Sequence, residues 1–243
     1  MSEQVRRFAT EEELASGVAE ALLSRLVSLQ QGGRVAQLCL TGGHIAHKVY
    51  VQLAHRVAGS ELHPGRLELW WGDERFVPTD DPVRNAGPTL AALAGLFPLD
   101  PARTHAMPSA DGVADNDASA ATYAKELADT VFDICLLGVG SDGHVASIFP
   151  GHPSFAPHQS HRVIGVSESP KPPSNRISIT LDTINTSGEV WFLVVGAEKA
   201  DAVLASWQGD AEVPAGVARG TDETIWFVDA DAAAELPYHV CEL

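Results

Sequence analysis

Short apolar runs alternate with helical patterns along most of the chain. After Thr10, hydrophobic residues recur every three or four positions, which predicts an amphipathic helix. The residues that form this apolar stripe are Leu14, Val18, Leu22, Leu26 and Leu29. Thr10 and Glu13 have the spacing of a capping pair at the helix start, and Gly32-Gly33 predicts its end. A short strand is expected just before the helix, over residues 5–9.

The same alternation predicts the remaining elements. Strands are expected at residues 35–40, 67–71, 132–137, 163–166, 177–181, 190–195 and 224–228. Helices are expected at residues 45–57, 85–96, 115–130 and 197–207, with a short Ala-rich helix after the last strand. Several strands are apolar on both faces, which is typical of a parallel sheet covered by helices on both sides. Because no repeat or linker interrupts the pattern, we expect one α/β domain over residues 1–243, built on a single mostly parallel sheet.

Composition limits the partners that the protein could bind. The chain has 16 basic and 32 acidic residues, a formal charge of −16. The electrostatic field of such a negative charge repels polyanions, so neither nucleic acid nor an anionic membrane surface is an expected partner. A small phosphorylated metabolite would need a local cluster of basic side chains and backbone N–H groups. No run of about 18 apolar residues occurs and no signal peptide is evident, so we expect a cytoplasmic protein.

Cysteine and histidine spacing gives little sign of a metal or redox site. Cys39 and Cys135 stand inside apolar runs and Cys241 is near the end of the chain, an odd total that favours buried, reduced thiols. His44/His47 and His158/His161 have a spacing of three that can chelate a metal. Neither a Cys pair nor an HExxH motif accompanies them, so no metal is expected.

Candidate chemistry gathers where strands end, because ligands of open α/β sheets bind beyond the carboxyl ends of the strands. In LTGGH, Gly42 and Gly43 precede a predicted helix, so they either form a phosphate-binding turn or are only a tight turn. In WWGDERFVP, Arg75 offers a planar donor group suited to phosphate, and Asp73 could hold it or a hydroxyl. The alternative for the second stretch is a surface cluster of salt bridges.

The third strand exit, GVGSDGH, carries a histidine. We expect Asp142 to cap a helix that begins about Gly143, with His144 in the first turn of this helix. The positive end of the helix would keep the imidazole neutral and suited to act as a general base toward water. An incidental surface histidine is the alternative. Residues 138–143 also begin like a dinucleotide-binding fingerprint but differ at its last position, so that possibility stays open.

Several stretches together resemble one family. GVGSDGHVASIFPGHP is similar to a signature of the 6-phosphogluconolactonases, and WGDERFVP followed by Asn85 is similar to a second one. ESPKPPSNRISITLDTIN, VWFLVVGAEKA and PAGVARG with TIWFVDADAA resemble later parts of the same family. The likeness follows the family order over nearly the whole chain. It implies a Rossmann-like sheet of the sugar-phosphate isomerase and lactonase type, flanked by helices on both faces.

The resemblance also implies an activity and residue roles. The family hydrolyses 6-phospho-D-glucono-1,5-lactone to 6-phosphogluconate in the oxidative pentose phosphate pathway, without cofactor or metal. By position, His144 would be the general base and Asp73 would help to orient the site. The expected phosphosugar-binding residues are Gly42, Gly43, His44, Arg75, Lys171 and Arg176. Taken alone, Lys171 and Arg176 would be read as surface charges. We expect a monomer whose partner is the phosphosugar lactone.

The chain departs from the family pattern at two places. TGGHIA stands where the family commonly has SGGSTP, and Arg84 stands where a serine commonly precedes the asparagine. His44 and Arg84 could themselves donate to the phosphate. Two other functions stay open: a glucosamine-6-phosphate deaminase, although the AFNEP-like stretch of that family is replaced here by VASIFPG, and a phosphosugar sensor without catalysis.

Overall fold

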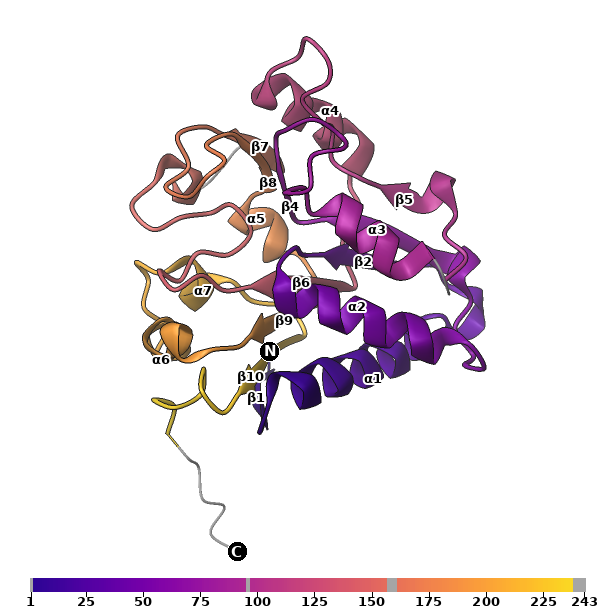
Figure 1. The fold of residues 1–243 in the computed structure, drawn as a ribbon, viewed down its shortest axis with the longest axis vertical. Helices are drawn as coiled ribbons and strands as arrows, with labels where there is room; N and C mark the ends of the chain where they lie inside the picture. The colour runs from indigo at the N-terminus through magenta and orange to yellow at the C-terminus, as the bar shows by residue number, and fades with distance from the viewer. Residues whose placement is uncertain (1, 95–96, 157–160, 238–243) are drawn as a thin grey trace, which may run out of the picture.

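The computed structural model describes residues 2–94, 97–156 and 161–237. Its centre is a seven-stranded sheet, which Figure 1 shows with helices around it. The strands lie in the order β1 (Ser2–Phe8), β10 (Glu223–Asp229), β9 (Glu189–Val194), β6 (Ile134–Gly138), β2 (Ala36–Leu40), β3 (Leu67–Trp71) and β5 (Thr104–His105). Every neighbouring pair in this sheet is parallel. The prediction of a mostly parallel α/β sheet is therefore confirmed.

Helices cover both faces of this sheet. They are α1 (Glu11–Leu29), α2 (His44–Val57), α3 (Ala86–Ala94), α4 (Asn116–Leu127), α5 (Leu181–Ile184), α6 (Ala200–Trp207) and α7 (Pro214–Val217). From β1 the chain moves through β2 and β3 to β5 at one edge, and then returns through β6 and β9 to β10. Because such crossovers are right-handed, α1, α2 and α3 lie on one face and α4 and α6 on the other. No helix in the described ranges is long and apolar enough to cross a membrane.

Helix α1 starts as its sequence predicts. The Thr10 hydroxyl accepts the N–H of Glu13, and the Glu13 carboxylate accepts the N–H of Ala9. Its apolar stripe from Leu14 to Leu29 is buried. The chain leaves the helix through Gly32 and Gly33, whose φ angles of 72° and 85° favour glycine.

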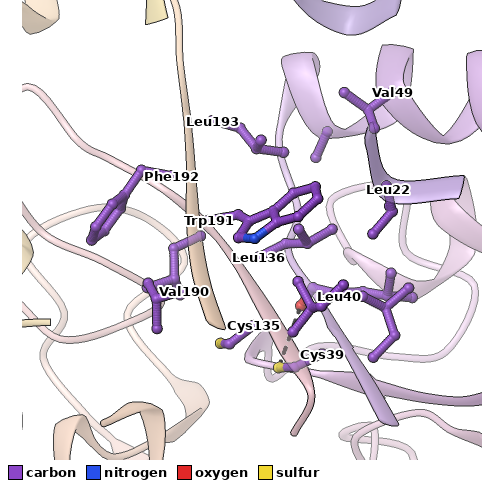
Figure 2. Close-up of a cluster of buried hydrophobic side chains, with 14 of the residues drawn as sticks. Leu22, Cys39, Leu40, Val49, Cys135, Leu136, Val190, Trp191, Phe192 and Leu193 are labelled. Carbon is purple, nitrogen blue, oxygen red and sulfur yellow. Dashed lines mark hydrogen bonds between the residues drawn. The ribbon is translucent and has the colours of Figure 1, made fainter. Parts of the chain in front are cut away.

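The core lies on both faces of the central strands. Along β9, Trp191 points toward Leu22 of α1 and Val49 of α2, whereas Phe192 points to the opposite face (Figure 2), where its ring stacks on Trp226 with centroids 3.9 Å apart. Cys39 and Cys135 are buried, free and directly opposite each other on β2 and β6, which confirms their place in the core. Cys241 is outside the described residues.

A second, antiparallel sheet stands at the carboxyl end of the first. It contains β4 (Asp73–Arg75), β8 (Arg176–Ile179) and β7 (Val163–Val166). Gly72 joins the two sheets, because its N–H donates to Leu40 O of β2 and its carbonyl accepts the N–H of Ile179. The sequence pattern predicts β7 and β8 but not their separation from the parallel sheet, and it predicts a loop where β4 lies.

Two predicted helices are absent from the described residues. The chain after β6 forms turns, because Gly143 and Ala146 have φ angles of 79° and 49°, in the left-handed region, which interrupts an α-helix. Asp142 therefore caps no helix, and the helix context of a dinucleotide-binding fingerprint is missing. After β10, the expected Ala-rich helix is a series of turns, in which the side chain and carbonyl of Asp229 accept the N–H groups of Ala232 and Ala233.

Other boundaries differ by a few residues. The helix predicted at 197–207 begins as a 3₁₀ turn over residues 197–199 and continues as α6. Helix α3 ends at Ala94 within the described part, and residues 95–96 of the predicted helix are outside it. Helix α4 is capped by Asp115, whose carboxylate accepts the N–H of Ala118.

Candidate active site

A cavity of about 460 Å³ opens at the carboxyl ends of β2, β3, β6 and β9. All eight site residues predicted from the sequence line this cavity: Gly42, Gly43, His44, Asp73, Arg75, His144, Lys171 and Arg176. A larger cavity of about 850 Å³ lies between α4 and β7, and none of the eight lines it. The convergence of charged side chains from distant segments makes the first cavity the candidate active site.

His144 and Asp142 form a hydrogen-bonded pair at the cavity wall. The Nδ1 atom of His144 lies 2.6 Å from Asp142 Oδ1. A carboxylate can only accept, so Nδ1 carries the proton and Nε2 of a neutral ring is left as a proton acceptor. The ring packs on Phe149 at a centroid distance of 4.7 Å, which fixes its plane. This arrangement suits a general base whose tautomer is set by a neighbouring carboxylate.

The charges around this pair favour a neutral imidazole and an ionised carboxylate. Burial is the largest influence on His144 and lowers its pKa, the Asp142 carboxylate raises it, and Lys171 lowers it again. For Asp142, burial opposes ionisation, but His144 and then Lys171 outweigh burial and lower its pKa to about 2. The expected neutral ring thus follows from burial and Lys171, whereas the helix end invoked from the sequence does not exist.

A glycine makes room for the His144–Asp142 pair. A Cβ atom on Gly140 would lie 1.9 Å from His144 Nδ1 and 2.4 Å from Asp142 Oδ1. The turn is closed by bonds from Gly140 N–H to His144 O and from Gly143 N–H to Gly140 O. These two N–H groups are therefore already engaged and do not point into the cavity as donors.

Asp73 is buried and bonded to several neighbouring residues, so it is not part of a surface cluster of salt bridges. The residue is 6% exposed, and Oδ2 accepts the Ser147 hydroxyl at 2.7 Å. The Asn85 amide donates to both the carbonyl and Oδ1 of Asp73, at 2.9 and 3.2 Å. Arg176 Nη1 lies 3.9 Å from Oδ2. Both carboxylate oxygens therefore have protein partners, which orients Asp73 at the cavity wall.

Arg75 and Arg176 stand opposite each other on β4 and β8. Arg75 Nη1 donates to Val83 O and Asn85 Oδ1, and its buried Nε has no hydrogen-bond partner in the described chain. Arg176 is 5% exposed, so the surface-charge reading of this residue is wrong. Its N–H groups donate to the carbonyls of Lys171, Pro172 and Pro173. Arg176 thus fixes the loop that carries Lys171, while Arg75 keeps donor capacity for an anion.

The glycine turn leads directly into α2. Gly43 has φ and ψ angles of 104° and 166°, a region that is essentially restricted to glycine, and the first turn of α2 leaves backbone N–H groups without intrahelical acceptors. The Tyr50 hydroxyl bonds both the N–H and the carbonyl of Thr41, which holds the turn on the helix. His44 lines the cavity, but its Nε2 lies 2.6 Å from Glu11 on α1.

The structure also bears on Arg84 and on the histidines with metal-binding spacing. Arg84, a candidate donor to phosphate, is 5% exposed and donates to the carbonyl of Met107 at 2.7 Å, so its guanidinium is already bonded within the protein. In the described ranges, no three His, Cys, Asp or Glu side chains are grouped to hold a metal ion. His158 is outside these ranges.

Four residues of the site have roles that the sequence pattern does not predict. The pattern favours Asp142 only as a helix cap, although a carboxylate two positions before a histidine can reach its ring. Asn85 stands in a motif that by itself indicates no role for it. Ser147 holds Asp73, and Lys199, which also lines the cavity, donates to Val139 O at 2.7 Å. Nothing local in the sequence marks the last two.

Comparisons with known proteins agree with the geometry. Residues 9–226 match the family described as glucosamine-6-phosphate isomerases/6-phosphogluconolactonase. A 6-phosphogluconolactonase of Streptomyces coelicolor is 43% identical over 238 residues, which cover 92% of this chain and 91% of that one. A 6-phosphogluconolactonase of Mycobacterium tuberculosis is 37% identical over 252 residues, with 98% and 100% covered.

Solved structures share the fold. The 6-phosphogluconolactonase of Thermotoga maritima aligns with a TM-score of 0.83 and 25% identity, over 94% of this chain and 100% of that one. A monomeric glucosamine-6-phosphate deaminase aligns with a TM-score of 0.78 at 23% identity, over 96% and 99% of the two chains. The second likeness concerns the fold alone.

Proposed function

The chain belongs to the glucosamine-6-phosphate isomerase/6-phosphogluconolactonase family, and we propose that it hydrolyses 6-phospho-D-glucono-1,5-lactone in the oxidative pentose phosphate pathway. The observation that carries the proposal is the Asp142–His144 pair beside a cluster of basic side chains in one cavity. A base aimed at water and a site for a phosphate are the two requirements of this reaction.

The first step of the proposed mechanism is removal of a proton from water. His144 Nε2 accepts the proton while the water oxygen bonds to the lactone carbonyl carbon, and Asp142 stabilises the imidazolium that forms. Collapse of the tetrahedral intermediate breaks the ring C–O bond, and the imidazolium returns the proton to the leaving alkoxide. The products are the carboxylic acid, which ionises in water, and a free hydroxyl.

The phosphate at the other end of the substrate provides orientation. In the proposal it lies against the Gly42–Gly43 turn and the first N–H groups of α2, within reach of Arg75. Anchoring the phosphate holds the carbonyl carbon near the base and its water, so that the attack takes place within one bound complex. These steps use water and the side chains of this chain.

The direct test is turnover of the phosphorylated lactone, measured as acid release above the spontaneous rate. Turnover with no ammonia release from glucosamine 6-phosphate supports the lactonase and excludes the deaminase. Binding of 6-phosphogluconate with hydrolysis at the spontaneous rate would instead support a phosphosugar sensor.

Replacing Arg75 by alanine tests the phosphate site. Because a charge-assisted contact to the phosphate is lost, we expect kcat/KM on the phosphorylated lactone to fall by about 10–100-fold. Hydrolysis of unphosphorylated gluconolactone should change little, since that substrate has no group for Arg75 to bind. Steady-state kinetics on both substrates give the comparison. An equal loss on both would argue against a phosphate role.

Replacing Lys171 by methionine tests the electrostatics of the base. The ammonium lies 3.2 Å from His144 Nδ1 and lowers the pKa of His144, so its removal raises that pKa. Since the base must be unprotonated, activity is lost as pH falls through this pKa. The acid limb of the kcat/KM profile should therefore move to higher pH, by roughly half a pH unit or more.

Asp142→Asn provides the opposite control for this shift. Loss of the carboxylate charge lowers the pKa of His144, so the acid limb should move to lower pH, while kcat also falls because the tautomer is no longer fixed. If the acid limb of the kcat/KM profile stays at the same pH in both variants, His144 is not the titrating base.

A further inference from the structure

A buried carboxylate next to the site has no role in the mechanism above. Glu74 lies between Asp73 and Arg75 on β4, and its side chain leaves the opposite face of the strand. It is 0% exposed. Burial, the largest influence, raises the pKa of Glu74, while bonds from backbone N–H groups and the charge of Arg84 lower it. A carboxylate is costly to bury, so its contacts indicate what it does.

Glu74 ties two chain segments together. Its Oε1 accepts the N–H of Arg75 at 2.8 Å and the N–H of Asn85 at 2.6 Å. Its Oε2 accepts the N–H of Ala86 at 2.9 Å and lies 3.5 Å from Arg84 Nη2. Since Ala86 is the first residue of α3, one side chain fixes the start of this helix against strand β4.

Glu74 holds the backbone of Asn85, and the side chain of Asn85 contacts residues that line the cavity. Its Oδ1 accepts Arg75 Nη1 at 2.5 Å, and its Nδ2 donates to Asp73. A Cβ atom on Gly42 would lie only 1.8 Å from Asn85 Oδ1, so Asn85 packs directly against the glycine turn. A shift of Asn85 would therefore move the Arg75 guanidinium relative to Gly42.

We propose that Glu74 is a positioning residue for substrate recognition, which aligns the Arg75 guanidinium with the Gly42–Gly43 turn through Asn85. The proposal rests on the proposed function, in which this turn and Arg75 bind the substrate phosphate. Glu74 touches no substrate and acts on the affinity for the phosphorylated end. In the described part of the chain, the hydrogen bonds of Glu74 and Asn85 reach neither His144 nor Asp142, so we expect the step at His144 to change little.

The test is Glu74→Gln, with both substrates. Glutamine has one acceptor oxygen, which can still accept the N–H groups of Arg75 and Asn85. Its NH₂ group would then face the N–H of Ala86 and the guanidinium of Arg84, where no acceptor remains. We expect KM for 6-phosphogluconolactone to rise about tenfold, as for the loss of one good contact. The kcat on this substrate and kcat/KM on unphosphorylated gluconolactone should stay within about twofold.

A matched control is available at the other end of the sheet. Glu189 is 5% exposed and is bound to Arg25 and to the indole N–H of Trp191, so it too is a buried carboxylate paired with an arginine. Glu189→Gln should leave KM unchanged on both substrates. If it raises KM as Glu74→Gln does, the effect is general destabilisation and the proposal fails.

Further outcomes separate this proposal from the proposed function. An equal loss on both substrates, or an unchanged KM, in Glu74→Gln overturns the positioning role. If that variant does not fold, Glu74→Asp keeps the charge but cannot span both segments, and the same selective rise in KM is expected from it. If Arg75→Ala is selective for the phosphorylated lactone while the Glu74 variants are not, only the positioning role is lost. If Arg75→Ala is itself unselective, the phosphate site fails.

Discussion

Replacing His144 by alanine should lower kcat on 6-phosphogluconolactone by about 10²–10⁴-fold, the usual contribution of a positioned general base. Asp142 and the basic side chains would remain, but water would have no acceptor for its proton. KM should change much less, because the phosphate contacts proposed for Arg75 and the glycine turn are untouched. Initial rates, corrected for spontaneous hydrolysis, give both constants.

The fold should survive this change, since the ring makes its contacts at the edge of an open cavity. Thermal unfolding followed by circular dichroism checks this point. Added imidazole should restore part of the activity by entering the space left by the ring. His55→Gln, at an exposed position near the end of α2, serves as the control. Near-normal turnover of the alanine variant would remove His144 from the role of base.

Replacing Gly140 by alanine should lower kcat by about 10²-fold with every charged group of the site still present. The new methyl group would overlap His144 Nδ1 and Asp142 Oδ1, at 1.9 and 2.4 Å, so the pair must separate or turn away from the substrate. The backbone of Gly140 is not in the left-handed region, so alanine adds no strain of its own there. Kinetics and the pH profile of kcat/KM measure the effect.

Gly87→Ala is a suitable control for this substitution. Gly87 lies on α3, and a Cβ atom there would meet no heavy atom within 4 Å. It should leave kcat unchanged, because the added methyl group meets no other part of the described chain. If Gly140→Ala kept full activity, the close packing of the His144–Asp142 pair would not matter for the reaction.

Much of the parallel sheet could be predicted from the sequence. Central strands such as β6 and β9 are apolar runs, and helix α1 carries an apolar stripe and a capping pair, so local pattern and final structure agree there. The edge strands β1 and β5 are largely polar and carry a weaker signal. The pattern failed after β6, where helix-like spacing from Gly143 is overridden by two left-handed residues. It failed again after β10, where alanines suggest a helix but Asp229 holds the chain in turns.

The candidate site was predictable only in part. Its residues stand at strand exits or in recognised motifs, so their gathering in one cavity follows from topology. The pairing of β4 with β8 could not be foreseen, because three residues of polar sequence give no strand signal. That pairing decides which side chains are buried and makes Arg176 a support for the Lys171 loop. The partnership of Asp142 with His144 likewise depends on a turn that local propensity does not encode.

The register of β4 and β8 has a further consequence. It makes Arg75 and Arg176 direct cross-strand neighbours, and both residues line the cavity. Burial is the main influence that lowers the pKa of Arg176, the charge of Asp73 raises it, and the charge of Arg75 lowers it again. Asp73 offsets part of the repulsion between the two arginines, and a dianion bound beside them would offset more of it. Affinity for the substrate and resistance to unfolding are coupled through the same two positive charges.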